Sequence, residues 1–174
     1  MRRLYPHNSP GEGHFAARLR RAGEEFRPQE PLPLKPCADA AFHSAIADLF
    51  LQPPKGCAHL LPDGRVTILR ASLPRGLQAL WTLAAGVPAG ELKKGRFEPA
   101  HSLFLAAHGG VFRKTLELPL ADARLSRFFA GEAVPCPGDW RGFVPVCADR
   151  FPLGFGKAVD GMLKNHLPKG LRIV

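Results

Sequence analysis

Basic side chains gather near the C-terminal end of the chain, on a segment that cannot form a long helix. Between residues 154 and 172 a single acid, Asp160, stands among several cations, and glycine and proline interrupt the sequence. The cations are Lys157, Lys164, Lys169 and Arg172. Each Lys or Arg that neutralises a phosphate releases a condensed counterion, so cations on short rigid elements suit a nucleic-acid backbone. The segment therefore favours binding to phosphates, and the alternative is an ordinary solvated basic surface.

The whole chain is basic. Its 174 residues include 24 Lys and Arg against 15 Asp and Glu, which gives a net charge of +9. This balance favours a polyanionic partner but says nothing about the fold. The mean hydropathy is −0.08, and no apolar run approaches the ~20 residues that a membrane span requires. No hydrophobic stretch follows the N-terminal arginines, so we expect no secretory signal, no membrane partner and a cytoplasmic location.

Residue types that hold metals or act as nucleophiles lack the spacing that such sites need. The cysteines at positions 37, 57, 136 and 147 show neither a C-x-x-C pair nor zinc-finger spacing, so we predict reduced thiols. The histidines share no helical face, and only His7 and His14, which flank a predicted turn, remain as an alternative metal pair. Gly156-Lys157 is also no nucleotide phosphate-binding loop, because Phe151 stands where such a loop needs glycine and Ala158 where it needs serine or threonine. We therefore predict no metal site.

The pattern of breakers and apolar residues divides the chain into four parts. Residues 1–23 predict two short strands around a turn, and residues 24–38, rich in proline, predict a linker without helix. Residues 39–88 predict a small α/β intermediate domain whose first helix is capped by Asp39. Residues 89–174 predict a compact β-barrel with two short helices, so the expected fold class is α+β.

Within these parts, alternating residues and turn residues locate the expected elements. The helix after Asp39 carries Phe42, Ile46, Leu49 and Phe50 on one face. A second helix is expected from Pro99, and a third closes at Gly131. Strands are expected at residues 57–61, 65–70, 78–85, 113–118, 142–148 and 153–159.

The sequence motifs of the C-terminal segment resemble those of a known protein family. Residues 151–157 (FPLGFGK), 163–165 (LKN) and 167–172 (LPKGLR) are similar to the closing segment of RsmF-type ribosomal RNA cytosine-5 methyltransferases of the Sun family. In that family this segment ends a PUA-like RNA-binding domain. The resemblance implies that the barrel of residues 89–174 is PUA-like.

Two further stretches extend this resemblance. Residues 90–101 (GELKKGRFEPAH) look like the opening of the same PUA-like domain, where a basic turn runs into a helix. Residues 3–7 (RLYPH), 11–15 (GEGHF) and 18–20 (RLR) are similar to the last strand pair of the methyltransferase domain. The resemblance thus implies that residues 1–23 are the closing strands of a methyltransferase sheet whose other strands this chain does not contain. We expect their open edge to pair across a homodimer, or to fold back on the chain.

The resemblance also implies which groups this chain does not carry. Family members hold S-adenosylmethionine and two motif cysteines upstream of the region represented here. The segment Pro135-Cys136-Pro-Gly138 comes near to one of those cysteine motifs but lies far downstream and lacks its serine. We read Cys136 as a strand or turn residue. We expect no catalytic residue and no cofactor in this chain, which should be inactive alone.

Binding to RNA is the function that remains. We expect Lys93, Lys94 and Arg96 on the turn entering the barrel, near the C-terminal cations, as phosphate contacts. Asn165 is expected to read a base edge or a 2′-hydroxyl, or alternatively to cap a turn. Phe97, Trp140 and Phe155 are candidates for base stacking, with burial in a core as the alternative.

The resemblance therefore implies an RNA-binding part of a ribosomal RNA 5-methylcytosine methyltransferase. Such a part would position ribosomal RNA for a catalytic domain supplied in cis or in trans, in ribosome biogenesis. A free-standing PUA-like RNA-binding regulator is one alternative. An enzyme with an active site that the sequence does not reveal is the other.

Overall fold

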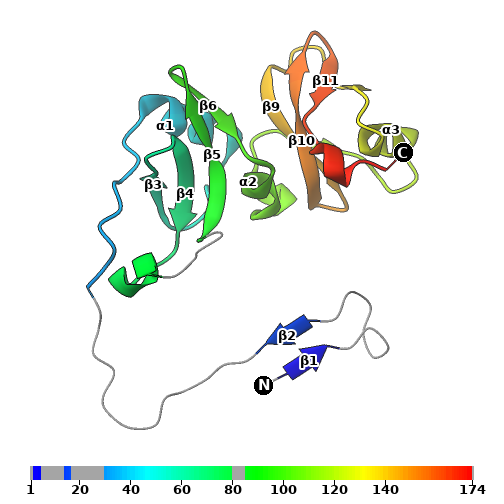
Figure 1. Ribbon diagram of the computed structural model, residues 1–174. Helices are drawn as coiled ribbons and strands as arrows, with labels where there is room; N and C mark the ends of the chain where they lie inside the picture. Colours follow the sequence, from blue (N-terminus) through cyan, green and yellow to red (C-terminus); the bar gives the residue numbers. More distant parts are fainter. Residues whose placement is uncertain (1, 5–13, 17–29, 80–84, 174) are drawn as a thin grey trace.

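The computed structural model describes residues 2–4, 14–16, 30–79 and 85–173. Three sheets are present in these residues: a two-stranded sheet, a four-stranded sheet and a five-stranded sheet. Figure 1 shows the two larger sheets side by side, with the helix α2 (His101–Leu105) between them. Within these residues no helix is long and apolar enough to cross a membrane.

The N-terminal strands form as expected. β1 (Arg2–Leu4) and β2 (His14–Ala16) pair antiparallel, with Arg3 opposite Phe15. The turn between them, with the alternative metal pair partner His7, lies outside the described residues. The dimer expected through residues 1–23 stays a prediction.

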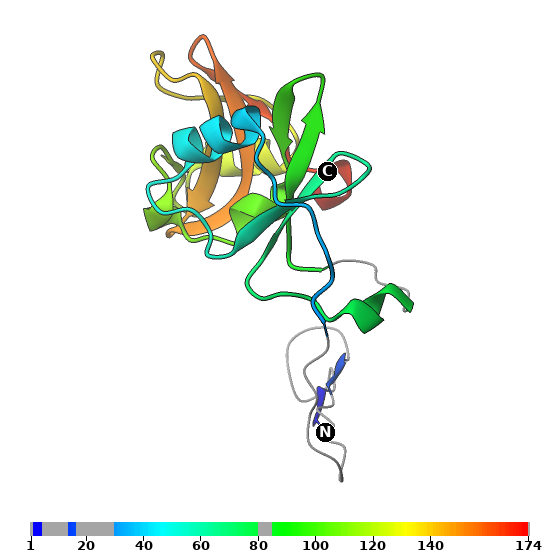
Figure 2. The same cartoon turned by 90° about the vertical axis from the view of Figure 1, so that its left-hand side faces the viewer.

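The described part of the predicted linker covers an edge of the four-stranded sheet. Pro36 forms a bridge with His59, and the Cys37 N–H donates to the carbonyl oxygen of Ala58 at 2.9 Å. Figures 1 and 2 show this segment running along the sheet to the start of α1. As predicted it contains no helix, but backbone hydrogen bonds hold it to the sheet, since the Leu60 N–H donates to the Lys35 carbonyl oxygen at 2.9 Å and Cys37 is buried. An otherwise open strand edge is thereby satisfied.

The four-stranded sheet and its helix follow the sequence pattern closely. The strands β3 (Cys57–Leu60) and β4 (Arg65–Leu69) form the predicted hairpin. The helix α1 (Ala40–Leu49) begins after Asp39, whose side chain accepts hydrogen bonds from the N–H groups of Ala41 and Phe42. The strand predicted over residues 78–85 is wrong where it is described, because Arg75–Ala79 form a 3-10 helix, η1.

The predicted boundary between residues 88 and 89 falls inside a strand. β5 (Val87–Lys93) pairs with β4, and β6 (Arg96–Pro99) pairs with β5, so residues 89–99 complete the four-stranded sheet. Pro99 therefore ends β6 and does not open the next helix, and α2 begins at His101. The backbone groups along β4 need a partner strand, and β5 supplies it; this long-range pairing is not visible in local sequence.

The five-stranded sheet forms the C-terminal half. Its strand order is β7-β9-β10-β11-β8, so the long hairpin of β9 and β10 lies in its middle. The elements are β7 (Leu116–Glu117), α3 (Ala123–Phe129), β8 (Val134–Pro135), β9 (Gly142–Ala148), β10 (Phe151–Val159), β11 (Met162–Asn165) and two 3-10 helices, η2 (Gly109–Val111) and η3 (Lys169–Leu171). The strand expected over residues 113–118 shrinks to β7, which lies parallel to β9. The α+β class is confirmed.

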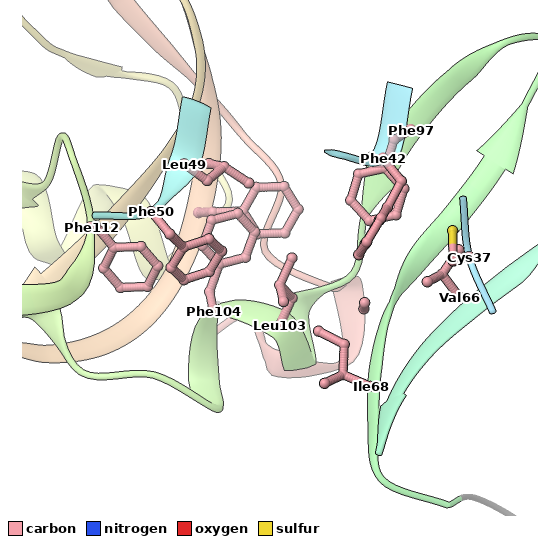
Figure 3. Packing of buried hydrophobic residues seen from close by; sticks show 12 residues of the cluster. Cys37, Phe42, Leu49, Phe50, Val66, Ile68, Phe97, Leu103, Phe104 and Phe112 are labelled. Atoms are coloured by element: carbon pink, nitrogen blue, oxygen red, sulfur yellow. The ribbon is translucent and has the colours of Figure 1, made fainter. Parts of the chain in front are cut away.

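The two faces of the five-stranded sheet pack against different cores. Val144, Val146 and Leu163 point into a core closed by Phe128 of α3. On the opposite face, Phe155 of β10 stacks on Phe104 of α2, with ring centroids 4.2 Å apart and planes 14° apart. Phe104 belongs to the core of the four-stranded sheet, where Figure 3 shows it beside Phe50 and Phe112. One core therefore joins both sheets.

Among the described residues, three hairpins turn through two residues with positive φ. Lys94-Gly95 joins β5 to β6 and Asp160-Gly161 joins β10 to β11, and each places glycine at the second position. The turn from β9 to β10 instead carries Arg150 there, with φ 68°. Such turns prefer glycine at this position, because a side chain in the left-handed region is strained.

Replacing Arg150 by glycine should therefore stabilise the fold. We expect Arg150→Gly to raise the free energy of unfolding by about 1 kcal/mol in chemical denaturation. Gly161→Arg is the matched control, since it puts the same side chain at the same position of another hairpin, and it should lower that free energy by a similar amount. Equal stability of Arg150→Gly and the parent would contradict the assignment of strain.

Candidate nucleic-acid interface

Two of the predicted cations stand directly opposite each other on neighbouring strands. Lys157 of β10 pairs with Lys164 of β11, and on its other side with Phe143 of β9. Directly paired residues point to the same face of a sheet, with Cβ atoms about 5 Å apart. Both lysines are exposed, and the Lys157 ammonium lies 5.6 Å from the centre of the Phe143 ring. The three side chains form one row across the sheet.

This row lies on the sheet face that turns toward the four-stranded sheet. Phe155, two residues before Lys157 on the same strand, faces Phe104 of α2. His166 follows β11, and its ring lies 5.2 Å from that of Phe155 and 5.7 Å from that of Phe143. Burial lowers the pKa of His166 and the charge of Lys157 lowers it further, while Glu98 of β6 opposes them. Glu98 and Lys157, from different sheets, therefore both lie close enough to act on one imidazole.

The second group of predicted cations occupies the hairpin of β5 and β6. Lys93, Lys94 and Arg96, together with Glu98, line an open groove of about 620 Å³. Lys93 pairs with Arg96 across the hairpin, and Lys94 stands in its turn. The expectation that these cations lie on a turn entering the barrel is wrong, since this hairpin belongs to the four-stranded sheet. Of the residues that line this groove, Glu98 lies close enough to His166 of the second sheet to act on its pKa.

Most of these cations carry no compensating charge. Lys93 is the exception, because its ammonium lies 2.6 Å from the Glu91 carboxylate, which raises the pKa of Lys93. In the described part of the chain, no carboxylate lies within 4.0 Å of the other exposed cations on the β5–β6 hairpin or on β10 and β11. These are Lys94, Arg96, Lys157 and Lys164. Exposed cations without a neighbouring carboxylate offer contacts to a polyanion.

Asn165 is held by internal hydrogen bonds. Its amide nitrogen donates to the carbonyl oxygens of Phe128 at 2.7 Å and Glu132 at 3.1 Å. Its amide oxygen accepts from the Leu167 N–H at 2.7 Å. Both donors are used, so the side chain has none left for a base. Of the two roles that the sequence left open, the structure favours the turn cap.

Arg172 and Lys169 lie apart from the row of lysines. The Arg172 guanidinium donates to the Leu167 carbonyl oxygen at 3.2 and 3.1 Å, and its side chain lies against Gly131 at the end of α3. Arg172 therefore fastens the C-terminal segment. Lys169 begins η3 and is exposed. Neither residue stands on a strand, because β11 ends at Asn165.

None of the three aromatic candidates presents a free ring. Phe97 and Phe155 are 6% and 4% exposed and belong to the shared core. Trp140 is half-buried against the core of the second sheet. Burial in a core, the alternative to base stacking, therefore holds for Phe97 and Phe155.

The cysteines behave as structural thiols. All four are free, as predicted. Cys136 follows β8 and is half-buried, and burial raises its pKa. Burial also raises the pKa of Cys147 to about 12, and the charge of Glu117 adds to this effect. Because the thiolate is the nucleophilic form, burial disfavours the nucleophilic state of both residues.

Sequence reasoning missed Glu98, Phe143 and His166. Glu98 alternates with the buried Phe97, which places it on the open side of β6, and this alternation was visible in the sequence. Phe143 and His166 reach the row of lysines only through strand register, which local sequence does not reveal.

Comparison with known protein families identifies the C-terminal part of the chain. Residues 115–173 match the family described as the PUA domain of the methyltransferase RsmF. The match runs from the strand β7 to the end of η3, so it contains Lys157 and Lys164. Lys93, Lys94 and Arg96 precede it, and the stretches at residues 90–101 and 3–20 also lie outside it.

Substitution of Asn165 tests whether it is structural. Asn165→Ala removes three hydrogen bonds and leaves their partners unsatisfied, so we expect a loss of about 2 kcal/mol in the free energy of unfolding. RNA affinity of the folded variant should be unchanged when measured by fluorescence anisotropy well below the unfolding transition. A stable variant with weakened RNA binding would instead assign Asn165 to the interface.

Proposed function

We propose, from the membership of residues 115–173 in the PUA-domain family of the methyltransferase RsmF, that this chain binds RNA for such an enzyme. The RNA would be ribosomal, and the chain would position it for an S-adenosylmethionine-dependent cytosine-5 methyltransferase domain supplied in cis or in trans. The observation that carries the proposal is the pair of exposed lysines, Lys157 and Lys164, directly opposite each other within the matched domain.

This lysine pair is unfavourable in the absence of a ligand. Like charges directly opposite on a sheet destabilise it, by roughly 0.5 kcal/mol for an exposed pair. A phosphate between the two ammonium groups removes the repulsion and gains two charge-assisted hydrogen bonds. The Phe143 ring below Lys157 limits where its side chain can lie, so less freedom is lost on binding.

The hairpin of β5 and β6 adds a second set of phosphate contacts. Lys94 and Arg96 are exposed and unpaired among the described residues, and they line a groove together with Glu98, whose charge acts on His166 of the second sheet. An RNA strand that contacts both hairpins is fixed in position and direction. Phosphate contacts give affinity and register but little sequence selectivity, which suits a domain that orients RNA for a separate catalytic centre.

The cysteines described above agree with a role in binding. Methyl transfer to a cytosine carbon in this family uses cysteine nucleophiles, and the raised pKa values of Cys136 and Cys147 disfavour their thiolates. We therefore propose that neither of these cysteines is a nucleophile. We also propose that the chain binds RNA without S-adenosylmethionine, since the family's cofactor site lies upstream of the region that this chain resembles.

Isothermal titration with millimolar S-adenosylmethionine tests the cofactor proposal. We expect no saturable heat from this chain, because the family's cofactor site lies outside the region it resembles. Titration of an RNA fragment into the same preparation serves as the positive control. A saturable cofactor signal would support an enzymatic role and contradict the proposal.

Charge reversal of the lysine pair tests RNA binding. Lys157→Glu and Lys164→Glu should each weaken binding to structured ribosomal RNA fragments regardless of sequence. Each should also reduce the slope of log affinity against log salt by about 0.7 to 0.9 per lost phosphate contact. Lys35→Glu makes the same charge change on the segment beside β3 and is the matched control.

The slope separates this proposal from its alternatives. If both reversals leave affinity and slope at the values of Lys35→Glu, the RNA surface lies elsewhere on the chain. If RNA binds as expected but the chain never stimulates methylation by a methyltransferase domain added in trans or fused in cis, the free-standing regulator is the better description.

A further inference from the structure

Glu98 is a carboxylate placed among cations of the groove on the β5–β6 hairpin. It alternates with the buried Phe97 and Pro99, so its side chain points to the open side of β6 together with that of Arg96. Lys93, Lys94 and Arg96 line the same groove. A carboxylate repels phosphate and weakens a surface whose only task is to bind an RNA backbone. Its position therefore calls for a different partner.

The neighbouring glutamate is already used. Glu91 stands directly opposite Glu98 on β5, and its carboxylate pairs with Lys93 at 2.6 Å. No hydrogen bond or ion pair within 4.0 Å involves the Glu98 carboxylate in the described residues. Glu98 acts on Lys93 and on His166 of the second sheet only through its charge. Both carboxylate oxygens are thus free to accept hydrogen bonds from a ligand.

The chemistry of an RNA ligand offers one matching group. An ionised carboxylate accepts hydrogen bonds and donates none, and it binds best to two parallel N–H donors. Among the RNA bases, guanine presents two adjacent donors, N1–H and the N2 amino group, on its Watson–Crick edge. Adenine and cytosine each present one amino group there, and uracil one N–H. That edge is accessible only when the guanine is unpaired, as in a loop or a bulge.

We propose that Glu98 selects an unpaired guanine, accepting hydrogen bonds from its N1–H and N2 amino groups while Lys94 and Arg96 hold the adjoining phosphates. The inference rests on the proposed RNA-binding function and gives it a base preference. The four-stranded sheet, which precedes the matched PUA domain, would then recognise a base. Lys157 and Lys164 of the matched domain would bind phosphates and so position the RNA. The groove is of a size that holds single ligand groups, which suits an extruded base better than a duplex.

Fluorescence anisotropy with five RNA hairpins tests this proposal on the full chain. The hairpins differ only in one bulged nucleotide: guanosine, inosine, adenosine, cytidine or uridine. We expect the guanosine bulge to bind roughly tenfold more tightly than adenosine or uridine, the size of one good bidentate contact. Inosine keeps N1–H but lacks the N2 amino group, so it should fall between guanosine and adenosine.

Two glutamine variants isolate the carboxylate. Glu98→Gln keeps the shape of the side chain but has one acceptor and an N–H donor, so the guanosine preference should disappear. Glu91→Gln removes the same charge from the opposite strand, and the preference should survive. Thermal unfolding of both variants confirms that each remains folded.

The outcomes separate the base preference from RNA binding itself. If Glu98→Gln tightens all five hairpins equally and the parent shows no preference, Glu98 only moderates the charge of the hairpin and the inference is overturned. Loss of salt-dependent binding in Lys157→Glu together with an absent base preference would retain the proposed function and reject this inference alone. If no hairpin binds the parent at any salt concentration, both are rejected.

Discussion

The stacking of Phe104 on Phe155 fixes how the two sheets lie against each other. Phe104 comes from α2, the short helix that follows the four-stranded sheet, and Phe155 comes from the central strand of the five-stranded sheet. Both rings are buried, and such a pair contributes about 1 kcal/mol beyond the burial of its surface. Glu98 of the β5–β6 hairpin and Lys157 of the β10–β11 hairpin consequently both lie close enough to His166 to act on its pKa. The candidate interface depends on that arrangement.

Glycines in β10 make this packing achievable on both faces of one strand. A Cβ atom at Gly156 would lie 2.5 Å from Leu163 Cγ and 2.6 Å from the Lys164 carbonyl oxygen. One at Gly154 would lie 3.2 Å from both His101 Cε1 and Leu167 Cδ1. The strand therefore lets neighbouring side chains approach its backbone on one face while Phe155 and Lys157 occupy the other. The FPLGFGK stretch thus has a structural role as well as a charged end.

The cations divide into those that hold the fold and those that face solvent. Arg172 binds a carbonyl oxygen near α3, and Lys93 is paired with a glutamate. Lys157 and Lys164 are directed to the same side by strand register alone. A chain that needed only solubility would gain nothing from setting two lysines opposite each other on a ladder. Their placement is best understood together with a polyanionic ligand.

The amino-acid sequence by itself determined the local elements: the helix capped by Asp39, the β3–β4 hairpin and the strand over residues 142–148 all form where capping, alternation and turn residues predict them. Its C-terminal motifs also predicted the similarity to the RsmF PUA domain that residues 115–173 match. These features depend on neighbours along the chain. The domain boundary predicted between residues 88 and 89 is wrong because both residues belong to β5, which pairs with the earlier strand β4. Likewise, only the tertiary structure decided that Asn165 caps a turn, that Phe97 is core, and that the charge of Glu98 acts on His166. Strand register and inter-sheet packing join residues that are far apart in sequence.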